Sequence, residues 1–198
     1  MTLTIYGRPG SRARRPLWVA RELGLAVESI EPAPDEIKQP AYLAINPNGK
    51  VPALVEDDGF TLFESFAQSL YLSKKHGLGR LYPAEAQAEA LVWQWTFWGL
   101  NELEKPLTTC LFERAIKPED QRDAAAAEKA EADLQAPLAV LDRALAGRDW
   151  LLGDGFTVAD INLAAIAALA KPARVGLDGH PNVARWLSAA LARPAYNG

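Results

Sequence analysis

The chain of 198 residues has little cysteine and lacks any long apolar run. Cys110 is the only cysteine, which excludes an internal disulfide bond and any Cys-x-x-Cys redox or zinc motif. We therefore expect a reducing, cytoplasmic setting. The longest apolar stretch, residues 161–170, is interrupted by Asn162 and is typical of a buried helix rather than a membrane span. Residues 3–6 form too short an apolar run for a signal peptide.

The chain also lacks an excess of positive charge, since its formal net charge at pH 7 is −4. This balance argues against a general affinity for nucleic acid or for anionic membranes. Apolar residues make up 49% and charged residues 23% of the chain, which is typical of a globular protein rather than a disordered one. The sequence has no internal repeat, and its length suits one large domain or two small ones.

Residues 46–65 contain the strongest structural signals in the chain. A turn rich in Asn, Pro and Gly comes first, and two short apolar runs, 53–55 and 60–63, follow on either side of Asp58-Gly59. An Asp-Gly pair between two apolar runs predicts a β-hairpin. Apolar side chains then recur at helical spacing, which predicts a helix over residues 64–76.

Two residues in this stretch also indicate a binding site. Pro52 has no N–H and stands directly before a strand, so it either opens the strand or follows a cis peptide bond. The backbone of Val51 would then be available to pair with an extended peptide ligand. Ser65 lies at a helix N-terminus, where N–H groups and the helix dipole attract a carboxylate. Ser65-x-x-Gln68 also fits a capping box that only starts the helix, and both interpretations stay open.

The first part of the chain alternates between strand and helix signals. Residues 3–6 predict a strand and residues 7–11 a loop, and a helix follows that ends at Gly24. Residues 26–30 predict a second strand, so the order is that of a βαβ unit with parallel strands. With the hairpin and the helix over 64–76, we expect a small mixed sheet covered by helices.

Strand signals stop after residues 78–84, which predict a linker. We therefore predict an α/β domain over residues 1–77 and an all-helical domain over residues 85–198. Thr157-x-x-Asp160 predicts a capping box inside the helical part. The periodicity of the helical part predicts helices over residues 85–112, 119–145, 157–171 and 183–191.

The motif NPNGKVPAL at residues 46–54, followed by Glu64-Ser65 and a helix, resembles the cytosolic glutathione S-transferases. The segment 147–154, with Asp160 after it, is similar to the second-domain signature of that family. The resemblance covers essentially the whole chain. It implies a thioredoxin-like N-terminal domain that binds glutathione, followed by a C-terminal helical bundle. It also implies glutathione as co-substrate, a small hydrophobic electrophile as second substrate, no metal, and a homodimer.

The same resemblance assigns roles to residues of the motif. Val51, before a cis Pro52, would pair its backbone with the cysteinyl part of glutathione. Ser65 would take the γ-glutamyl carboxylate and Glu64 the γ-glutamyl amino group. Lys50 would face the glycyl carboxylate. These roles agree with the chemistry of the residues, because an anion suits a helix start and an ammonium suits a carboxylate.

Ser11 stands where the serine-type, theta-like members of the family keep their active serine, and Arg15 also matches. A free thiol has a pKa of about 8.5 and is mostly protonated near pH 7. A hydroxyl that donates a hydrogen bond to the sulfur, next to a helix N-terminus, stabilises the thiolate and lowers that pKa. The resemblance thus implies that Ser11 activates the thiol of glutathione. A helix cap is the alternative role for this serine.

Two features leave the mechanism open. Tyr6 is the rival to Ser11, because some classes use a tyrosine from the first strand, although its place inside the strand favours a packing role. Pro16 lies where the first helix should already run, so we expect this helix to begin near Arg15. A non-catalytic ligand-binding or assembly protein on the same scaffold is therefore an alternative, as is a glutathione-dependent isomerase or peroxidase.

Two clusters of side chains have no single interpretation from sequence. Arginines crowd the loop after the first strand, and we hypothesise that they favour an anionic ligand. Aromatic residues gather in the first helix of the helical part, and their spacing prevents them from facing one way. These aromatic residues pack in the core, line a second-substrate pocket or form a dimer contact. The two clusters are Arg8, Arg12, Arg14 and Arg15, and Trp93, Trp95, Phe97 and Trp98.

Overall fold

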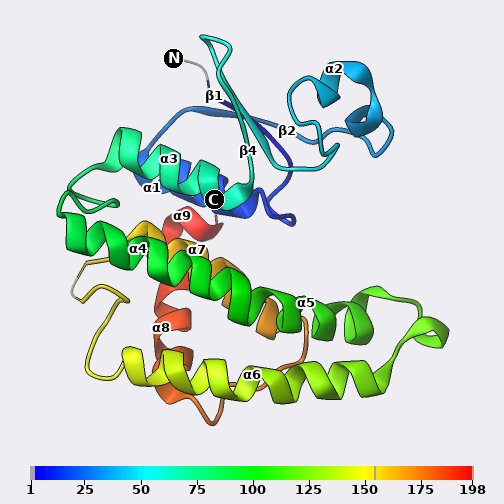
Figure 1. The fold of residues 1–198 in the computed structure, drawn as a ribbon, viewed down its shortest axis with the longest axis vertical. Helices are drawn as coiled ribbons and strands as arrows, with labels where there is room; N and C mark the ends of the chain where they lie inside the picture. Colours follow the sequence, from blue (N-terminus) through cyan, green and yellow to red (C-terminus); the bar gives the residue numbers. More distant parts are fainter. Residues whose placement is uncertain (1–2, 154, 198) are drawn as a thin grey trace. The chain divides into compact units, whose positions relative to one another are not determined.

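A computed structural model describes residues 3–153 and 155–197 of the chain. The described chain forms two compact units, one that ends at Ala84 and one that spans Glu85–Asn197 (Figure 1). The first unit is α/β and the second is helical, so the predicted fold class is confirmed. Asp154, the last residue of the segment compared with the second-domain signature, lies outside the described residues. No helix in the described ranges is both long enough and apolar enough to cross a membrane.

The first unit contains a sheet of four strands in the order β2-β1-β3-β4. The first two strands are parallel, as the βαβ order predicts, and the hairpin strand β3 is antiparallel to both of its neighbours. The sheet therefore mixes a crossover with a hairpin. The elements of this unit are β1 (Leu3–Tyr6), α1 (Arg14–Leu23), β2 (Val27–Ile30), η1 (Glu36–Lys38), α2 (Pro40–Leu43), β3 (Ala53–Glu56), β4 (Thr61–Phe63) and α3 (Ser65–Gly77).

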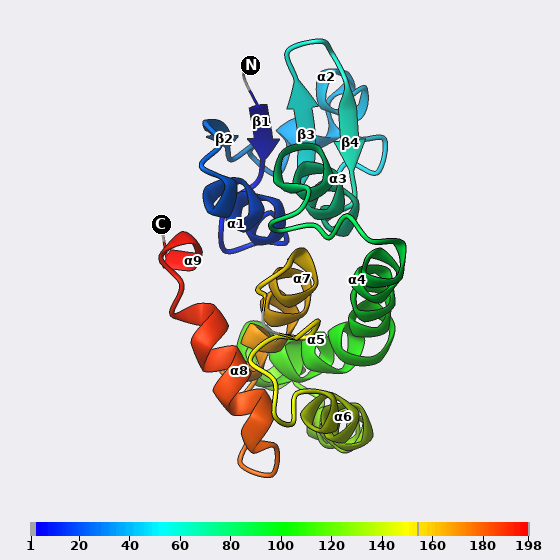
Figure 2. The same cartoon turned by 90° about the vertical axis from the view of Figure 1, so that its left-hand side faces the viewer.

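Helices α1 and α3 pack side by side and share the core of this unit with the sheet (Figure 2). Helix α1 ends where Gly24 adopts a left-handed conformation and donates its N–H back to the last turn. Pro16 is the third residue of α1, so its missing N–H falls in the first turn, where it breaks no intrahelical bond. The helix begins at Arg14, one residue from the predicted start. Trp18, Ile5 and Leu72, which come from α1, β1 and α3, are fully buried.

Helices make up the second unit, with α7 at its centre in contact with α4 and α8 (Figure 2). Every residue of α7 is buried, which explains its nearly unbroken apolar sequence. A short π-helical stretch, η2, joins α4 to α5 in the single long helix that the periodicity predicts, and a second one, η3, extends this helix beyond α5. The elements are α4 (Ala86–Trp98), η2 (Gly99–Glu104), α5 (Lys105–Leu111), η3 (Phe112–Ile116), η4 (Glu119–Gln121), α6 (Ala124–Ala144), α7 (Val158–Ala167), η5 (Ala168–Ala170), α8 (Pro181–Leu191) and α9 (Pro194–Asn197).

The predicted capping box at the start of α7 is confirmed. Thr157 accepts the N–H of Asp160 on its side chain, and the Asp160 carboxylate accepts the backbone N–H of Thr157 at 2.9 Å. The same carboxylate also accepts the N–H of Leu151 and the indole Nε1–H of Trp186, both at 2.9 Å. Burial raises the pKa of Asp160, and these donors oppose that rise. Asp160 therefore has a structural role: it joins the start of α7 to Leu151 and to Trp186 on α8.

Candidate functional site

Three segments of the first unit meet at one end of the sheet because of the strand register. Tyr6, the last residue of β1, lies opposite Ala53, and Ala53 in turn lies opposite Phe63, the last residue of β4. The loop after β1, the segment before β3 and the start of α3 therefore all lie at this end. The sequence-predicted site residues belong to these three segments, so the register gathers them.

Gly7 shows how closely two of these segments approach. A Cβ added at this position would lie 3.3 Å from the Oγ of Ser11 and 3.3 Å from the Cβ of Val51. It would also lie only 2.7 Å from the Cβ of Ala13, and the φ angle of Gly7 is +128°. A side chain does not fit here, and its conformation also favours glycine. Ser11 and Val51 therefore line the same small space beside Gly7.

Ser11 lies half-buried in the loop before α1. Its hydroxyl donates to the carbonyl oxygen of Arg8 at 2.8 Å and accepts the N–H of Ala13 at 3.1 Å. The N-cap residue of α1 is Ala13, which makes no side-chain cap. Ser11 lies two residues before this N-cap, and its hydroxyl makes a cap-type bond to the N–H of Ala13 in the turn that leads into α1, so the capping role and the proposed role both stay open. The hydroxyl lies next to the N-terminus of α1, where an anion is favoured.

The peptide bond between Val51 and Pro52 is cis, as the resemblance implies. The residue before this pair is held firmly, because the carbonyl oxygen of Lys50 accepts from Tyr42 Oη at 2.8 Å and from Asn46 Nδ2 at 2.6 Å. The side chain of Lys50 is exposed to solvent. Within the described ranges, the backbone N–H and C=O of Val51 have no hydrogen-bond partner. They are available to an extended peptide.

Ser65 is the first residue of α3 and is only 3% exposed. Its Oγ accepts a hydrogen bond from Nη1 of Arg15 at 2.9 Å, and the Arg15 guanidinium lies 4.1 Å above the ring of Phe66. A permanent positive charge thus lies beside a helix N-terminus, which is a favourable place for a carboxylate. The residue before it, Glu64, is exposed and has a φ angle of 71°. Such a conformation is costly for a non-glycine residue and clusters at ligand sites.

Of the two interpretations of Ser65-x-x-Gln68, the capping box is wrong. The start of α3 has no side-chain cap among the described residues. Gln68 instead donates from Nε2 to the carbonyl oxygen of Pro52 at 3.2 Å and to that of Leu62 at 2.8 Å. The side chain reaches across the fold rather than back along its own helix, and the sequence spacing does not reveal this.

Tyr6, the rival to Ser11, packs against another tyrosine. Its ring meets that of Tyr42 edge to face, with 5.6 Å between the centroids. Burial raises the pKa of Tyr42 to about 12, and the nearby Tyr6 adds to the rise. Tyr6 therefore has the packing contact that its place in the strand predicts.

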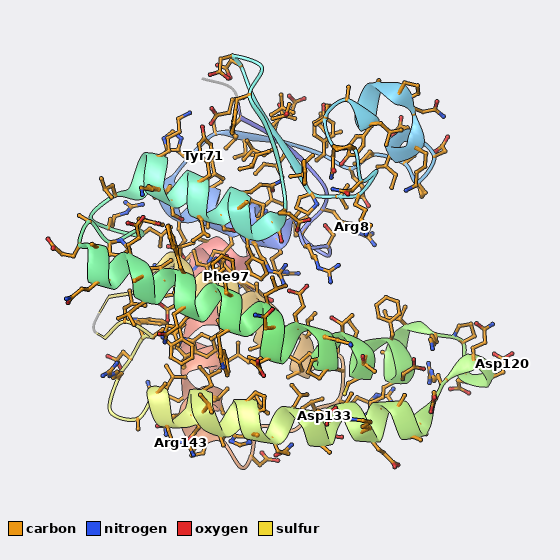
Figure 3. All side chains as sticks on the ribbon, in the orientation of Figure 1. Arg8, Tyr71, Phe97, Asp120, Asp133 and Arg143 are labelled. Atoms are coloured by element: carbon orange, nitrogen blue, oxygen red, sulfur yellow. The ribbon has the colours of Figure 1, made fainter. Side chains whose placement is uncertain are left out.

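The aromatic residues of α4 face different ways, as their spacing predicts. Trp95 is buried and meets Trp98 edge to face, with 5.3 Å between the centroids. Trp93 is 47% and Phe97 54% exposed, and Phe97 is labelled on α4 in Figure 3. Two of these four residues thus lie on the surface of the helical unit.

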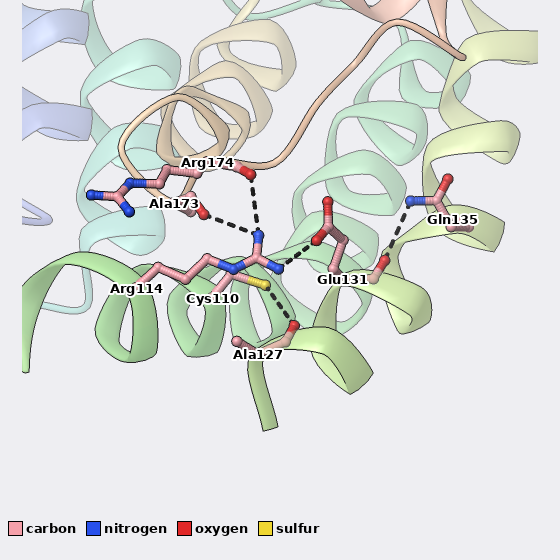
Figure 4. Close-up of polar contacts among 7 residues, drawn as sticks. All are labelled: Cys110, Arg114, Ala127, Glu131, Gln135, Ala173 and Arg174. Carbon is pink, nitrogen blue, oxygen red and sulfur yellow. Dashed lines mark hydrogen bonds and ion pairs between the residues drawn. The ribbon is translucent and has the colours of Figure 1, made fainter. Parts of the chain in front are cut away.

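A cavity of about 270 Å³ lies in the helical unit, lined by Arg114, Ala127 and neighbouring residues. The Arg114 guanidinium is used within the protein: it donates to the carbonyl oxygens of Ala173 and Arg174 and pairs with Glu131 (Figure 4). None of the sequence-predicted site residues lines this cavity. The nearby Cys110 is buried, and burial raises the pKa of its thiol. The contacts of Arg114 thus hold segments of the helical unit together, and the cavity is not the expected site.

Comparison with known proteins agrees with the geometry of the first unit. Residues 1–74 match the family described as Glutathione S-transferase, N-terminal domain, and residues 103–194 match the corresponding C-terminal domain. The chain therefore has both halves of one enzyme class, a thioredoxin-like domain followed by a helical domain. It belongs to the glutathione S-transferase family.

The relatives match along nearly the whole chain. Glutathione S-transferase 3 from Zea mays is 36% identical over 204 residues, which cover 98% of this chain and 91% of that protein. Glutathione S-transferase GstB from Escherichia coli is 33% identical over 199 residues, which cover 98% of this chain and 95% of that protein. The theta class glutathione S-transferase from Xanthomonas axonopodis pv. citri, solved with glutathione bound, superposes with a TM-score of 0.90. It is 33% identical, and the match covers 98% of this chain and 95% of that one.

Proposed function

We propose that this protein conjugates the thiolate of glutathione to small apolar electrophiles, with Ser11 as the group that stabilises the thiolate. The observation that supports this most directly is the position of Gly7. The Ser11 hydroxyl and Val51 both lie against it, at the end of the sheet where α3 begins. A peptide paired with the backbone of Val51 would thus carry its sulfur close to a hydroxyl group.

The other residues would hold the ends of the tripeptide. The γ-glutamyl carboxylate would lie at Ser65, where the N-terminus of α3 and the Arg15 guanidinium favour an anion. The γ-glutamyl ammonium would face the exposed carboxylate of Glu64, and the exposed ammonium of Lys50 would face the glycyl carboxylate. Each charged group of glutathione thereby meets a group of opposite charge.

The chemical step needs an anionic sulfur. The Ser11 hydroxyl would turn its proton from the Arg8 carbonyl oxygen to the sulfur, while the N–H of Ala13 continues to orient its oxygen. The thiol proton leaves to solvent, and the hydrogen bond lowers the thiol pKa toward neutral pH. The sulfur electron pair then forms the new carbon–sulfur bond. The leaving group of the electrophile departs with its bonding pair.

Calorimetric titration with glutathione, followed by an assay with 1-chloro-2,4-dinitrobenzene, tests this proposal. Ser11→Ala should bind glutathione but lose about 10- to 100-fold in kcat/KM, and the pH profile should move toward the ordinary thiol pKa. Tyr6→Phe is the matched control and should keep the wild-type pH profile. Binding without turnover by the wild type would instead support the non-catalytic alternative. If Tyr6→Phe rather than Ser11→Ala moved the profile, the roles would be reversed.

We also propose that the protein works as a homodimer in the cytoplasm, where the glutathione thiol is kept reduced. Trp93, Phe97 and Leu100 support the dimer, because these exposed apolar residues follow one another at helical spacing along α4 and η2. An apolar row of this kind on a protein surface is typical of an interface.

A further inference from the structure

The Gln68 carboxamide is an unusual group to find inside the first unit. The residue is 0% exposed, although it lies on a helix whose other buried side chains include Phe66 and Leu72. Burying an amide costs free energy unless its hydrogen bonds are replaced. An apolar side chain would satisfy packing at this position without that cost. The polar group therefore needs a reason other than packing.

Its contacts supply that reason. Nε2 donates to the carbonyl oxygen of Pro52, next to Val51, and to the carbonyl oxygen of Leu62, two residues before Glu64. The backbone N–H of the same residue donates to the carbonyl oxygen of Glu64 at 3.0 Å. The side chain thus ties the Val51-Pro52 corner to the segment that leads into α3.

The orientation of this amide follows from its partners. Both groups that it meets are carbonyl oxygens, which accept hydrogen bonds, and the NH₂ group is the only donor of the carboxamide, so the nitrogen faces them. Its Oε1 is buried without a hydrogen-bond partner among the described residues. The protein accepts the cost of one unbonded acceptor at this position, which argues that the two bonds from the nitrogen matter.

We infer that Gln68 is a positioning residue that fixes the separation between the Val51-Pro52 corner and the start of α3. The inference rests on the proposed function, in which glutathione spans these two places. A groove that is held at the right length before binding needs no ordering when the ligand arrives. Without the bonds from the Gln68 side chain, a ligand that contacts both the Val51-Pro52 corner and the start of α3 must also order these two places when it binds. A ligand that contacts only one of the two places does not have this cost.

Gln68→Met tests the inference, because methionine has a similar length and no donor. We expect the affinity for glutathione, measured by calorimetry, to fall about tenfold, the factor expected for the loss of a buried hydrogen bond. Cysteinylglycine lacks the γ-glutamyl group and reaches only the Val51 end. Its inhibition constant should be unchanged. The pH profile of kcat/KM should also stay in place, because Ser11 is not altered.

Leu72→Val is the matched control, since Leu72 is fully buried on the same helix and is no part of the proposed site. It should lower the melting temperature without changing either affinity, which separates positioning from stability. Gln68→Leu replaces Gln68→Met if the latter is not recovered folded. Equal losses for glutathione and cysteinylglycine, or no loss for either, would overturn the inference while leaving the proposed function intact. A wild type that does not bind glutathione would overturn both.

Discussion

Arg15 donates from Nη1 to the Oγ of Ser65 at 2.9 Å and thereby joins α1 to the first residue of α3. Both residues are only 3% exposed. The guanidinium also lies over the ring of Phe66, so its position is fixed on two sides. In the proposed mechanism, this contact places a positive charge and a helix N-terminus against the same carboxylate of glutathione.

Replacing Arg15 by methionine should therefore weaken glutathione binding. We expect KM for glutathione to rise about tenfold or more, because a buried charged partner of the carboxylate is lost. Arg15→Lys should recover only part of the affinity, since an ammonium cannot reproduce the planar fork of a guanidinium. Arg21→Met, on the same helix, is the control and should leave KM unchanged. Steady-state kinetics with varied glutathione measures the effect, and equal KM values for the two methionine variants would contradict it.

Gly7→Ala should damage the site through the backbone. The added Cβ would meet the Cβ of Ala13 at 2.7 Å, in a conformation that alanine rarely adopts. We expect a loss of about 1–3 kcal/mol in the free energy of unfolding and a clear fall in kcat/KM, because Ser11 and Val51 must move. Gly59→Ala is the control: its φ angle is also positive at +85°, but no atom lies within 4 Å of the added Cβ.

Urea unfolding measures the free energy of unfolding of both variants, and the chloronitrobenzene assay measures their kcat/KM. Gly59→Ala should lose stability through backbone strain and keep its affinity for glutathione. Equal losses of activity in Gly7→Ala and Gly59→Ala would show that strain alone, and not crowding beside Ser11, is responsible.

Asp142 on α6 caps a different helix. Its carboxylate accepts the backbone N–H groups of Asn182 and Val183, at 2.8 and 3.1 Å, at the start of α8. Burial is the largest single influence and raises the pKa of Asp142, but the hydrogen bonds from Asn182 and Val183 and the nearby His180 together lower it. A lowered pKa in the folded state means that the ionised carboxylate stabilises the fold above the unfolded pKa of about 3.9. That stability is lost as the pH falls through the folded pKa.

Asp142→Ala should thus lower the free energy of unfolding by about 1–2 kcal/mol at pH 7, as expected for the loss of a helix cap. The difference from the wild type should shrink as the pH is lowered below about 4. Asp133→Ala, on the same helix, removes an exposed carboxylate that pairs with Lys129 at 2.8 Å, and should cost little. Urea unfolding at several pH values measures both, and a difference that grows on acidification would contradict the assignment.

Two identical spacings in this sequence show what local patterns can predict. Thr157-x-x-Asp160 is a capping box, because both of its side chains bond within one turn of α7. Ser65-x-x-Gln68 has the same spacing but makes no cap, because the Gln68 amide bonds to Pro52 and Leu62. Those partners become neighbours only after the strands have paired. The spacing predicts a local bond and contains no information on a bond to a residue far away in the sequence.

The same difference between local and distant contacts explains which other features could be predicted from the sequence. The hairpin follows from an Asp-Gly turn between apolar runs, and β3 pairs antiparallel with β4 as this predicts. The bond between Arg15 and Ser65 joins residues far apart in the chain, so no local pattern predicts it. The fold class and the segments of the candidate site could thus be predicted from sequence. The contacts that join these segments required the structure.

The exposed apolar row on α4 and η2 makes the proposed homodimer testable. Trp93, Phe97 and Leu100 are 47%, 54% and 42% exposed and lie on one face of the helix. Burying aromatic side chains contributes much of the energy of many interfaces. Phe97→Glu should therefore shift the sedimentation coefficient from that of a dimer to that of a monomer at micromolar concentration. Val140→Glu places the same charge at another exposed apolar residue, on α6, and should leave the dimer intact. A monomeric wild type, or a dimer that survives Phe97→Glu and not Val140→Glu, would show that this face is not the interface.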